Sequence, residues 1–260
     1  MIQVAVLGYG TVGSGVVEVI EKNKAEINKK SGEELNVKYI LDLRDFPGDP
    51  YEDKVVHDVN MILDDPEVKI ICETMGGLKP AYDFTKKALS LGKSVCTSNK
   101  ELVAAHGPEL IRVAHENKCN YLFEASVGGG IPIIRPLNQC LAANEISEIC
   151  GILNGTTNYI LTQMTENGES FGTALKAAQE KGYAEADPTL DIDGFDTAHK
   201  LVLLIRLAWG VDYPYTKMPI EGIRNLDKMD IDFAREFGYR IKLLGRARMR
   251  DGKLEAGVFP

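Results

Sequence analysis

Residues 2–13 read IQVAVLGYGTVG, an apolar run that ends in a glycine-rich turn, and a helix is predicted from about Ser14 to Lys24. A buried strand, a Gly-X-Gly-X-X-Gly turn and a helix, in that order, are typical of a dinucleotide-binding unit. The glycines let the backbone approach a pyrophosphate, which then binds to N–H groups at the helix N-terminus. The residues expected to contact the cofactor are Gly8, Gly10, Thr11, Val12 and Gly13. The alternative is a glycine-rich turn in another α/β fold.

The end of the second predicted strand, Val37 to Leu43, bears on which nucleotide binds. Asp42 and Arg44 lie on the same side of an extended segment because side chains alternate along a strand. A carboxylate there accepts hydrogen bonds from a ribose 2′-hydroxyl and favours NAD, whereas a guanidinium pairs with a 2′-phosphate and favours NADP. The presence of both leaves the choice between NAD and NADP open, and either residue is alternatively a plain surface charge.

Strands and helices continue to alternate as far as residue 124. Three more strands and two helices are predicted, at Val68–Glu73, Ser94–Thr97, Asn120–Glu124, Pro80–Leu91 and Glu101–Asn117. This order predicts a Rossmann-type, doubly wound parallel sheet, which binds ligands at the carboxyl ends of its strands. Thr74 and Lys100 fall on that edge and are expected to contact the cofactor, with Lys100 near both nicotinamide and substrate. A lysine at a strand end is otherwise a solvent-exposed charge.

Three consecutive glycines follow the last of these strands, within EASVGGGIP at residues 124–132. Glycines free the backbone carbonyls to turn toward a cation or ligand. One glutamate with carbonyl oxygens suits a hard ion and not a transition metal. A hinge between domains is a second interpretation, compatible with the first. We expect a dinucleotide-binding domain at residues 1–130 and a substrate-binding and dimerisation domain at residues 131–260.

The pattern changes after Pro132. The predicted helices are Ile133–Ala143, Thr157–Asn167 and Phe171–Lys181, and the predicted strands are Glu145–Leu153, Tyr239–Met249 and Leu254–Phe259. The last two strands are joined by the turn Arg250-Asp251-Gly252-Lys253, which predicts an α+β domain with an open antiparallel sheet. An uncovered sheet face needs a partner, so a homodimer through this half is expected. Because the chain stops at the end of a strand, we expect a further segment to be missing.

The stretch with the most evident chemistry is GYAEADPTLDIDGFDTAHK, at residues 182–200. It places five carboxylates before one lysine: Glu185, Asp187, Asp191, Asp193 and Asp196. Asp196 and Lys200 are four residues apart in a predicted helix, so they share a face and can pair. An ammonium held by carboxylates can protonate a developing alkoxide, while the other acids bind a substrate amino group. The alternative is an acidic, solvated loop ahead of an ordinary helix.

Composition limits the possible partners and location. The 260 residues are 44% hydrophobic and 26% charged, as in a soluble globular protein, and the net charge of −8 argues against nucleic acid or an anionic membrane as partner. No apolar run reaches the roughly 18 residues that span a bilayer, and no signal peptide follows Met1. The five cysteines form no Cys-X-X-Cys pair, so buried free thiols and a cytoplasmic location are expected.

Four stretches together resemble the homoserine dehydrogenase family: residues 97–104 (TSNKELVA), 123–134 (FEASVGGGIPII), 151–164 (GILNGTTNYILTQM) and 182–200. The match runs in order over essentially the whole chain. The resemblance implies reversible hydride transfer between NADH or NADPH and L-aspartate 4-semialdehyde, giving L-homoserine on the route to threonine and methionine. Reducing an aldehyde also needs a proton on oxygen, which an ammonium can supply.

The resemblance also implies roles for individual residues. Lys200 is similar to the family's catalytic lysine, and Lys100 to its second lysine, near the nicotinamide. The acids that place the substrate amine and the lysine are matched by Glu185, Asp191 and Asp196. Arg44 resembles the arginine that contacts the 2′-phosphate in NADP-using members. His199 is beside the motif but is given no role.

The resemblance further implies a sodium site. Its ligands are matched by Glu124 and the backbone of Val127, Gly129 and Ile131. Family members continue past the last residue of this chain and often add a regulatory domain. Two other functions stay open: a related dehydrogenase acting on another amino-acid aldehyde or imine, and a non-catalytic dinucleotide-binding sensor. In each case the expected partner is a small molecule.

Overall fold

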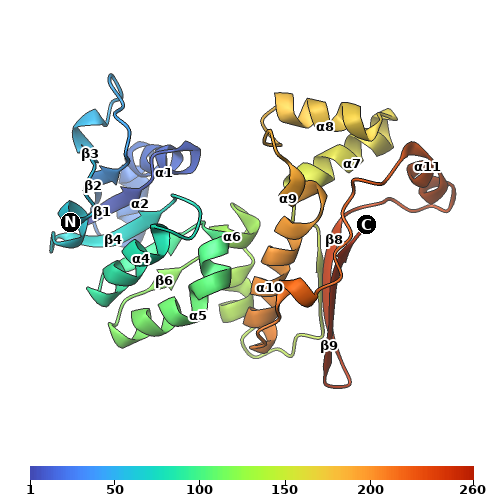
Figure 1. The fold of residues 1–260 in the computed structure, drawn as a ribbon. Helices are drawn as coiled ribbons and strands as arrows, with labels where there is room; N and C mark the ends of the chain where they lie inside the picture. The colour runs from blue at the N-terminus through green and yellow to red at the C-terminus, as the bar shows by residue number, and fades with distance from the viewer. The chain divides into compact units, whose positions relative to one another are not determined.

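The computed structural model describes residues 1–260, which divide into two compact units, Met1–Pro132 and Ile133–Pro260 (Figure 1). The first unit is built on a sheet of six strands and the second on a sheet of three. Each unit has a hydrophobic core of its own. None of the helices combines the length and hydrophobicity that a membrane-spanning segment requires.

The six strands of the first unit are all parallel. In chain order they are β1 (Ile2–Leu7), β2 (Leu35–Leu41), β3 (Val55–Val56), β4 (Val68–Glu73), β5 (Ser94–Thr97) and β6 (Tyr121–Leu122). Across the sheet the order is β3-β2-β1-β4-β5-β6. That order is the one found in doubly wound dinucleotide-binding folds, with the ligand crevice where the strand order reverses, between β1 and β4. The predicted parallel Rossmann-type sheet is confirmed.

Helices and short helical turns connect these strands: α1 (Thr11–Lys22), α2 (Lys24–Ser31), η1 (Glu52–Lys54), α3 (Asn60–Leu63), α4 (Ala81–Ser90) and α5 (Lys100–Glu116). The short helix α6 (Ala125–Gly128) follows the last strand. Successive side chains of β1 point to opposite faces of the sheet. Val4 and Val6 pack in one cluster with Val17 of α1. Ala5 and Leu7 are fully buried on the other face. A strand buried on both faces explains why β1 is apolar almost throughout.

Several boundaries differ from the predictions for physical reasons. β2 ends at Leu41 and not at Leu43, because the next residue, Asp42, turns its side chain to the backbone N–H of Tyr9. β6 is short because Glu124 already has helical dihedral angles at the start of α6. The helix α2 was not predicted, and it buries none of its residues, so it has no apolar stripe for the sequence to reveal.

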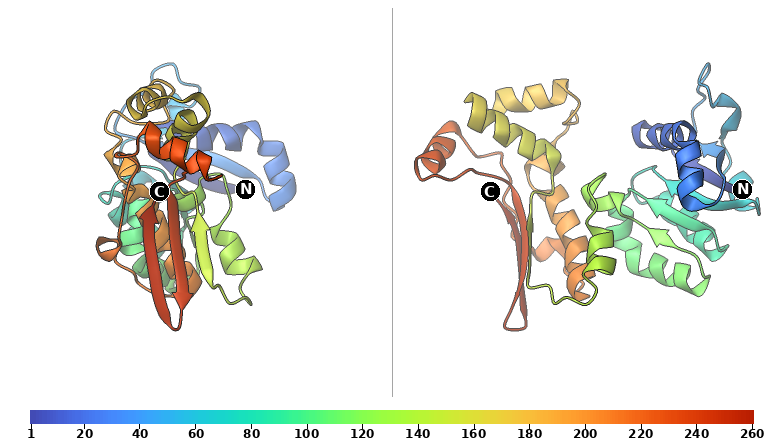
Figure 2. Two further views of the ribbon diagram at one scale, coloured as in Figure 1. Left: turned by 90° about the vertical axis from the view of Figure 1, so that its right-hand side faces the viewer. Right: turned by 180° about the vertical axis from the view of Figure 1, so that it is seen from behind.

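The second unit has an antiparallel sheet ordered β7 (Glu148–Gly151), β8 (Leu244–Arg250) and β9 (Lys253–Phe259). Figure 2 shows β8 and β9 as a long hairpin with β7 alongside. The helices and helical turns are η2 (Pro136–Cys140), α7 (Gly155–Asn167), α8 (Phe171–Glu180), α9 (Thr189–Ile192), α10 (Phe195–Trp209), η3 (Tyr215–Lys217) and α11 (Lys228–Glu236). The predicted α+β class with an antiparallel sheet is confirmed.

The hairpin turn formed as predicted, and the first predicted helix of this unit is shorter than predicted. Arg250 pairs with Lys253, and both central residues, Asp251 and Gly252, have positive φ, as two-residue hairpin loops require. The helix expected over Ile133–Ala143 is shorter than predicted: residues 134–140 are helical and include the π-helical turn η2. Apart from the buried Ile134, residues 133–143 are exposed or half-buried, so the apolar surface is too small to stabilise a longer helix.

The helix α10 packs on one face of this sheet. Leu201 and Ile205, one turn apart, are fully buried in one cluster with Ala247 of β8 and Val258 of β9. Gly245 makes the close approach feasible, because a Cβ atom there would lie 3.0 Å from the Leu153 side chain and 3.1 Å from that of Thr197. The absence of a side chain at this position therefore lets the segment before α7 lie against α10, where the catalytic candidates are found.

A glycine at residue 13 is required by packing, and we expect Gly13→Ala to destabilise the first unit by about 1–3 kcal/mol. A Cβ atom there would overlap the carbonyl oxygen of Gly8 and lie 2.8 Å from the hydroxyl of Thr74. Gly15→Ala in the same helix is the matched control, since its Cβ meets nothing within 4 Å. Chemical denaturation should show a loss of stability for the first variant and a gain of about 0.5–1 kcal/mol for the second. Equal effects would contradict the packing argument.

Candidate active site

The glycine-rich turn leaves the start of α1 without a side-chain cap. Gly8 has a φ of +93°, a conformation that L side chains rarely adopt. Gly10, the residue before α1, is extended and provides no capping side chain. The exposed residues Thr11 and Val12 then begin the helix, so the first backbone N–H groups of α1 have no intrahelical acceptor. This is the arrangement that binds a phosphate at a helix N-terminus.

Thr74 fixes this turn from the neighbouring strand. Its hydroxyl donates to the carbonyl oxygens of Leu7 at 3.0 Å and Gly8 at 2.9 Å, and its backbone N–H donates to Leu7 at 2.9 Å. The hydroxyl also occupies the space beside Gly13. Thr74 therefore lies at the predicted place, and its side chain holds the turn in shape.

Asp42 and Arg44 form one ion pair. Nε of Arg44 donates to Oδ1 of Asp42 at 2.9 Å and Nη2 donates to Oδ2 at 3.0 Å. The backbone N–H groups of Tyr9 and Arg44 add further bonds to the carboxylate, at 2.8 and 3.0 Å. The Arg44 guanidinium, with these N–H donors, holds the pKa of Asp42 well below its usual range. The carboxylate is only 10% exposed and the guanidinium 64%, so the arginine is the group presented to solvent.

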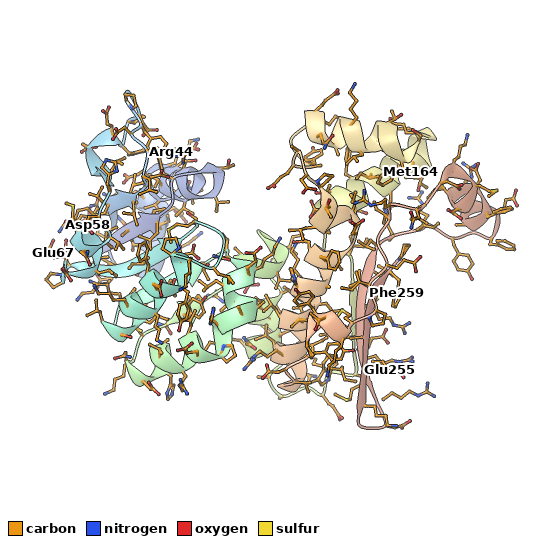
Figure 3. The ribbon with its side chains drawn as sticks, in the orientation of Figure 1. Arg44, Asp58, Glu67, Met164, Glu255 and Phe259 are labelled. Carbon is orange, nitrogen blue, oxygen red and sulfur yellow. The ribbon has the colours of Figure 1, made fainter.

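Arg44 lies in the loop after β2 (Figure 3), and aromatic rings support its guanidinium. Arg44 lies over the Phe46 ring at 5.1 Å, and Phe46 meets the Tyr9 ring edge to face at 4.9 Å. The Tyr9 hydroxyl donates to Asp49, and burial together with this bond raises the pKa of Tyr9 to about 12. His57, which the sequence did not single out, places Nδ1 2.7 Å from the carbonyl oxygen of Asp42.

Lys100 is the first residue of α5 and is positioned by Asn99. The Asn99 side chain accepts from the backbone N–H of Leu102 at 3.1 Å and donates to the carbonyl of Gly77 at 2.7 Å. It thereby caps α5 and ties it to the loop after β4. An asparagine directly before a predicted helix is the sequence signal that could have revealed this cap.

A buried polar chain continues below Asn99. Thr97 accepts from the backbone N–H of Asn99 and donates to Glu73 at 2.5 Å. Glu73 is fully buried and also accepts from the backbone N–H of Met75 at 2.9 Å. The ends of β4 and β5 are thus joined by side chains, and the loops that carry Thr74 and Lys100 are fixed relative to each other.

In the second unit, Lys200 and Asp196 form the predicted pair on α10. Nζ of Lys200 lies 2.8 Å from Oδ2 of Asp196 and donates to the carbonyl oxygen of Leu153 at 2.8 Å. The Asp196 side chain is 2% exposed and that of Lys200 17%. A lysine has three N–H donors, so two protein acceptors leave one for a ligand.

Asn154 completes the cluster, and sequence reasoning missed it. Its Nδ2 donates to Asp191 at 2.7 Å and to Asp196 at 2.9 Å. Its Oδ1 accepts from the backbone N–H of Thr157, which caps α7. One amide therefore holds two carboxylates near each other and anchors a helix. The same N-cap signal, an asparagine before a predicted helix, could have identified it.

The other acids of the motif have different surroundings. Asp193 pairs with Arg224 at 2.8 and 2.9 Å, and Asp187 bonds to Thr189 within a turn. Glu185 is exposed on the loop between α8 and α9, and its side chain makes no hydrogen bond to the Lys200 cluster. The structure therefore brings together Asp191, Asp196 and Lys200. The ring of His199 stacks edge to face on Tyr215 at 4.6 Å.

The predicted cation segment forms a single helical turn. Glu124 precedes α6 and is half-buried, Val127 is buried near its end, and Gly129 follows with a φ of +59°. Ile131 is exposed and donates its N–H to Gly128 at 3.0 Å. The last carbonyls of such a turn have no acceptor role within the helix. No group of three or more His, Cys, Asp or Glu side chains gathers anywhere in a way that could hold a metal ion.

Two family models match the chain. The homoserine dehydrogenase model matches residues 132–260, and the model of the homoserine dehydrogenase NAD-binding domain matches residues 8–124. The two matches follow the two compact units and leave few residues outside.

Individual proteins agree with the models. Homoserine dehydrogenase from Pseudomonas aeruginosa is 40% identical over 260 residues, covering 100% of this chain and 60% of that protein. The structure of a homoserine dehydrogenase from Thiobacillus denitrificans has a TM-score of 0.91 and 42% identity, covering 100% of this chain and 61% of that one. A protein of Archaeoglobus fulgidus assigned to the same family has a TM-score of 0.86 and 32% identity, and 84% of it is covered. The chain spans about 60% of the length of these curated relatives and belongs to the homoserine dehydrogenase family.

Proposed function

We propose that the chain is an NAD(P)-dependent homoserine dehydrogenase that interconverts L-aspartate 4-semialdehyde and L-homoserine in the biosynthesis of threonine and methionine. The observation that carries the proposal is the cluster of Lys200, Asp196, Asn154 and Asp191. The buried carboxylate of Asp196 holds the Lys200 ammonium in place. The Asn154 side-chain amide bonds to Asp196 and to a second carboxylate, that of Asp191. Family membership supports the same reaction.

Residues of the first unit fit a dinucleotide. The uncapped N-terminus of α1 binds the pyrophosphate through backbone N–H groups, and Gly10 leaves room because a Cβ atom there would meet nothing within 4 Å. When bound, the cofactor supplies or accepts the hydride. Lys100, at the carboxyl edge of the sheet, contacts the nicotinamide end, and Thr74 holds the turn against which the phosphates lie.

Lys200 transfers the proton. Asp196 and the Leu153 carbonyl orient the ammonium, whose third N–H donates to the substrate oxygen as that oxygen gains charge. The same nitrogen receives the proton when homoserine is oxidised. Asp191 uses one oxygen for Asn154 and offers the other to the substrate ammonium, and Glu185 binds that group from its loop. An amino group held between carboxylates selects an amino-acid substrate.

Replacement of Lys200 tests this role. Lys200→Ala should lower kcat by about 10²–10⁴-fold, the usual contribution of a positioned acid or base, and leave cofactor affinity nearly unchanged. The measurement is homoserine-dependent formation of reduced nicotinamide, followed by absorbance. Lys176→Ala, at an exposed lysine of α8, is the matched control and should behave as wild type.

Three outcomes would redirect the proposal. Retention of wild-type turnover by Lys200→Ala would refute its role. Turnover of another amino-acid aldehyde or imine, without homoserine oxidation, would indicate a related dehydrogenase. Tight cofactor binding without any turnover by the wild type would indicate a sensor, although a sensor has no use for a lysine held by a buried acid.

The ion pair at the end of β2 supports NADP as the preferred cofactor. Asp42 has both oxygens bonded to protein donors, so it is poorly suited to accept from a ribose 2′-hydroxyl. Arg44 is exposed beside it and can pair with a 2′-phosphate. A hyperthermophilic archaeal homoserine dehydrogenase mutant, 28% identical with a TM-score of 0.80, was solved in complex with NADPH.

Arg44→Ala should raise KM for NADP about tenfold or more and change KM for NAD much less, because only NADP carries the phosphate that the guanidinium bonds. Steady-state kinetics with both nucleotides provide the comparison. Arg112→Ala, an exposed arginine of α5, controls for the loss of a surface charge. An equal rise for both nucleotides would show that Arg44 does not distinguish them.

We also propose a sodium ion at the turn around α6, held by Glu124 and the carbonyl oxygens of Val127, Gly129 and Ile131. The donor set is a single carboxylate with carbonyl oxygens, which suits a hard cation, and the positive φ of Gly129 redirects the chain there. Replacing sodium by choline in the buffer should lower the melting temperature of the wild type and not of Glu124→Ala. The same shift in both proteins would exclude the site.

The face of the sheet opposite α10 supports a homodimer. Arg246 pairs with Glu148 at 2.6 Å and Arg248 with Glu255 at 2.8 Å, and Phe259 is partly exposed beside them (Figure 3). Such a face can meet a second copy of itself about a two-fold axis. Light scattering should give twice the chain mass.

We place the enzyme in the cytoplasm, where its five free cysteines stay reduced.

A further inference from the structure

Two cysteines of the first unit lie side by side in the parallel sheet. Cys72 of β4 and Cys96 of β5 are register partners on neighbouring strands, and their sulfur atoms are 3.3 Å apart. Partners in register point to the same face, here the face that packs against Val17 of α1. None of the catalytic or binding roles described above uses either thiol.

The remaining cysteines have no such neighbour. Cys119 is partly buried and its thiol lies near the carbonyl oxygens of Leu89 and Ala114. Cys140 and Cys150 are exposed, contrary to the expectation that the cysteines are buried. The close pair is therefore a particular feature of β4 and β5.

The backbone geometry is suitable for a disulfide bond. Neighbouring strands lie about 4.8 Å apart, within the range of roughly 4.4–6.8 Å between Cα atoms that a disulfide bridges. Cys72 is 8% exposed, whereas Cys96 is more accessible, so a small oxidant reaches Cys96 first. The hydrogen bond with Cys72 lowers the pKa of Cys96, and the same bond together with burial raises the pKa of Cys72.

We propose that Cys72 and Cys96 form a reversible, redox-sensitive pair that closes to a disulfide in the presence of a peroxide. The Cys96 thiolate attacks hydrogen peroxide and becomes a sulfenic acid, releasing hydroxide that takes up a proton to give water. The Cys72 thiol then attacks the Cys96 sulfur, forming the S–S bond and releasing a second water. Two thiols lose two electrons, and one peroxide is reduced to two waters.

Formation of the disulfide should distort the glycine-rich turn proposed to bind the cofactor, a prediction that rests on the proposed function. A disulfide bond is about 2.05 Å long, so the sulfurs must approach each other by more than about 1 Å within a close-packed interior. Thr74, two residues after Cys72, holds Gly8 through its hydroxyl. Thr97, next to Cys96, is bonded to Glu73 at 2.5 Å. Movement of the strand ends therefore displaces the groups that shape the nucleotide site.

The experiment treats the purified protein with hydrogen peroxide and then blocks remaining thiols. Mass spectrometry of an unreduced digest should show Cys72 and Cys96 in one linked peptide. Titration of NADPH fluorescence should give a Kd raised by about tenfold or more, since a 1 Å displacement of binding groups is costly. Dithiothreitol should restore the original Kd.

Variants separate this pair from general oxidation. Cys96→Ser, with Cys72→Ala as a second variant in case the first disturbs folding, should keep the same Kd before and after peroxide. Cys119→Ser, at a partly buried cysteine of the same unit, should respond as wild type. Peptide mapping needs no turnover, so it decides on the disulfide even if homoserine oxidation is absent.

Two results would overturn the inference. One is the absence of the linked peptide at peroxide concentrations that oxidise the exposed Cys140 and Cys150. The other is a linked peptide with an unchanged Kd for NADPH, which would leave the disulfide without the predicted effect.

Discussion

Burial of the Asp196 carboxylate is the constraint on which the second unit depends. A buried charge is costly unless it is paired and hydrogen-bonded, and this one is 2% exposed. It pairs with Lys200, which lies one turn further along α10, and accepts a hydrogen bond from Asn154, which lies 42 residues earlier in the chain. The segment before α7 must therefore lie against α10, and Gly245 leaves the space for it. The position of the Lys200 ammonium follows from the need to compensate the buried charge of Asp196.

A buried carboxylate that is satisfied by hydrogen bonds also organises the first unit. Glu73, fully buried, is satisfied by a hydroxyl and a backbone N–H, and the residues that satisfy it carry the loops at the cofactor edge. The Thr74 hydroxyl donates to the backbone carbonyl oxygens of Leu7 and Gly8 and so shapes the glycine-rich turn. The Thr74, Thr97 and Glu73 side chains at this edge are bonded within the protein, which leaves the backbone N–H groups at the start of α1 as donors available to an anion.

The pair formed by Asp42 and Arg44 shows how one group can decide the role of another. Considered separately, each residue suggests a different nucleotide. As an ion pair, the carboxylate becomes a support that fixes the guanidinium, and the guanidinium remains exposed beside Phe46. A charge that is fixed before the ligand arrives loses less conformational entropy on binding. The ion pair therefore leaves the guanidinium, and not the carboxylate, as the group exposed at the end of β2.

Local patterns in the sequence determined the strand, turn and helix of residues 2–22, the bounds of β4 and β5, the 250–253 hairpin turn and the pairing of Asp196 with Lys200. Each depends on periodicity or on neighbours a few residues apart, which the covalent chain itself brings together. Only the tertiary structure placed Asn154 between Asp191 and Asp196 and set Cys72 beside Cys96. These contacts join residues 24 to 42 positions apart, and their geometry arises from packing, which no local pattern encodes.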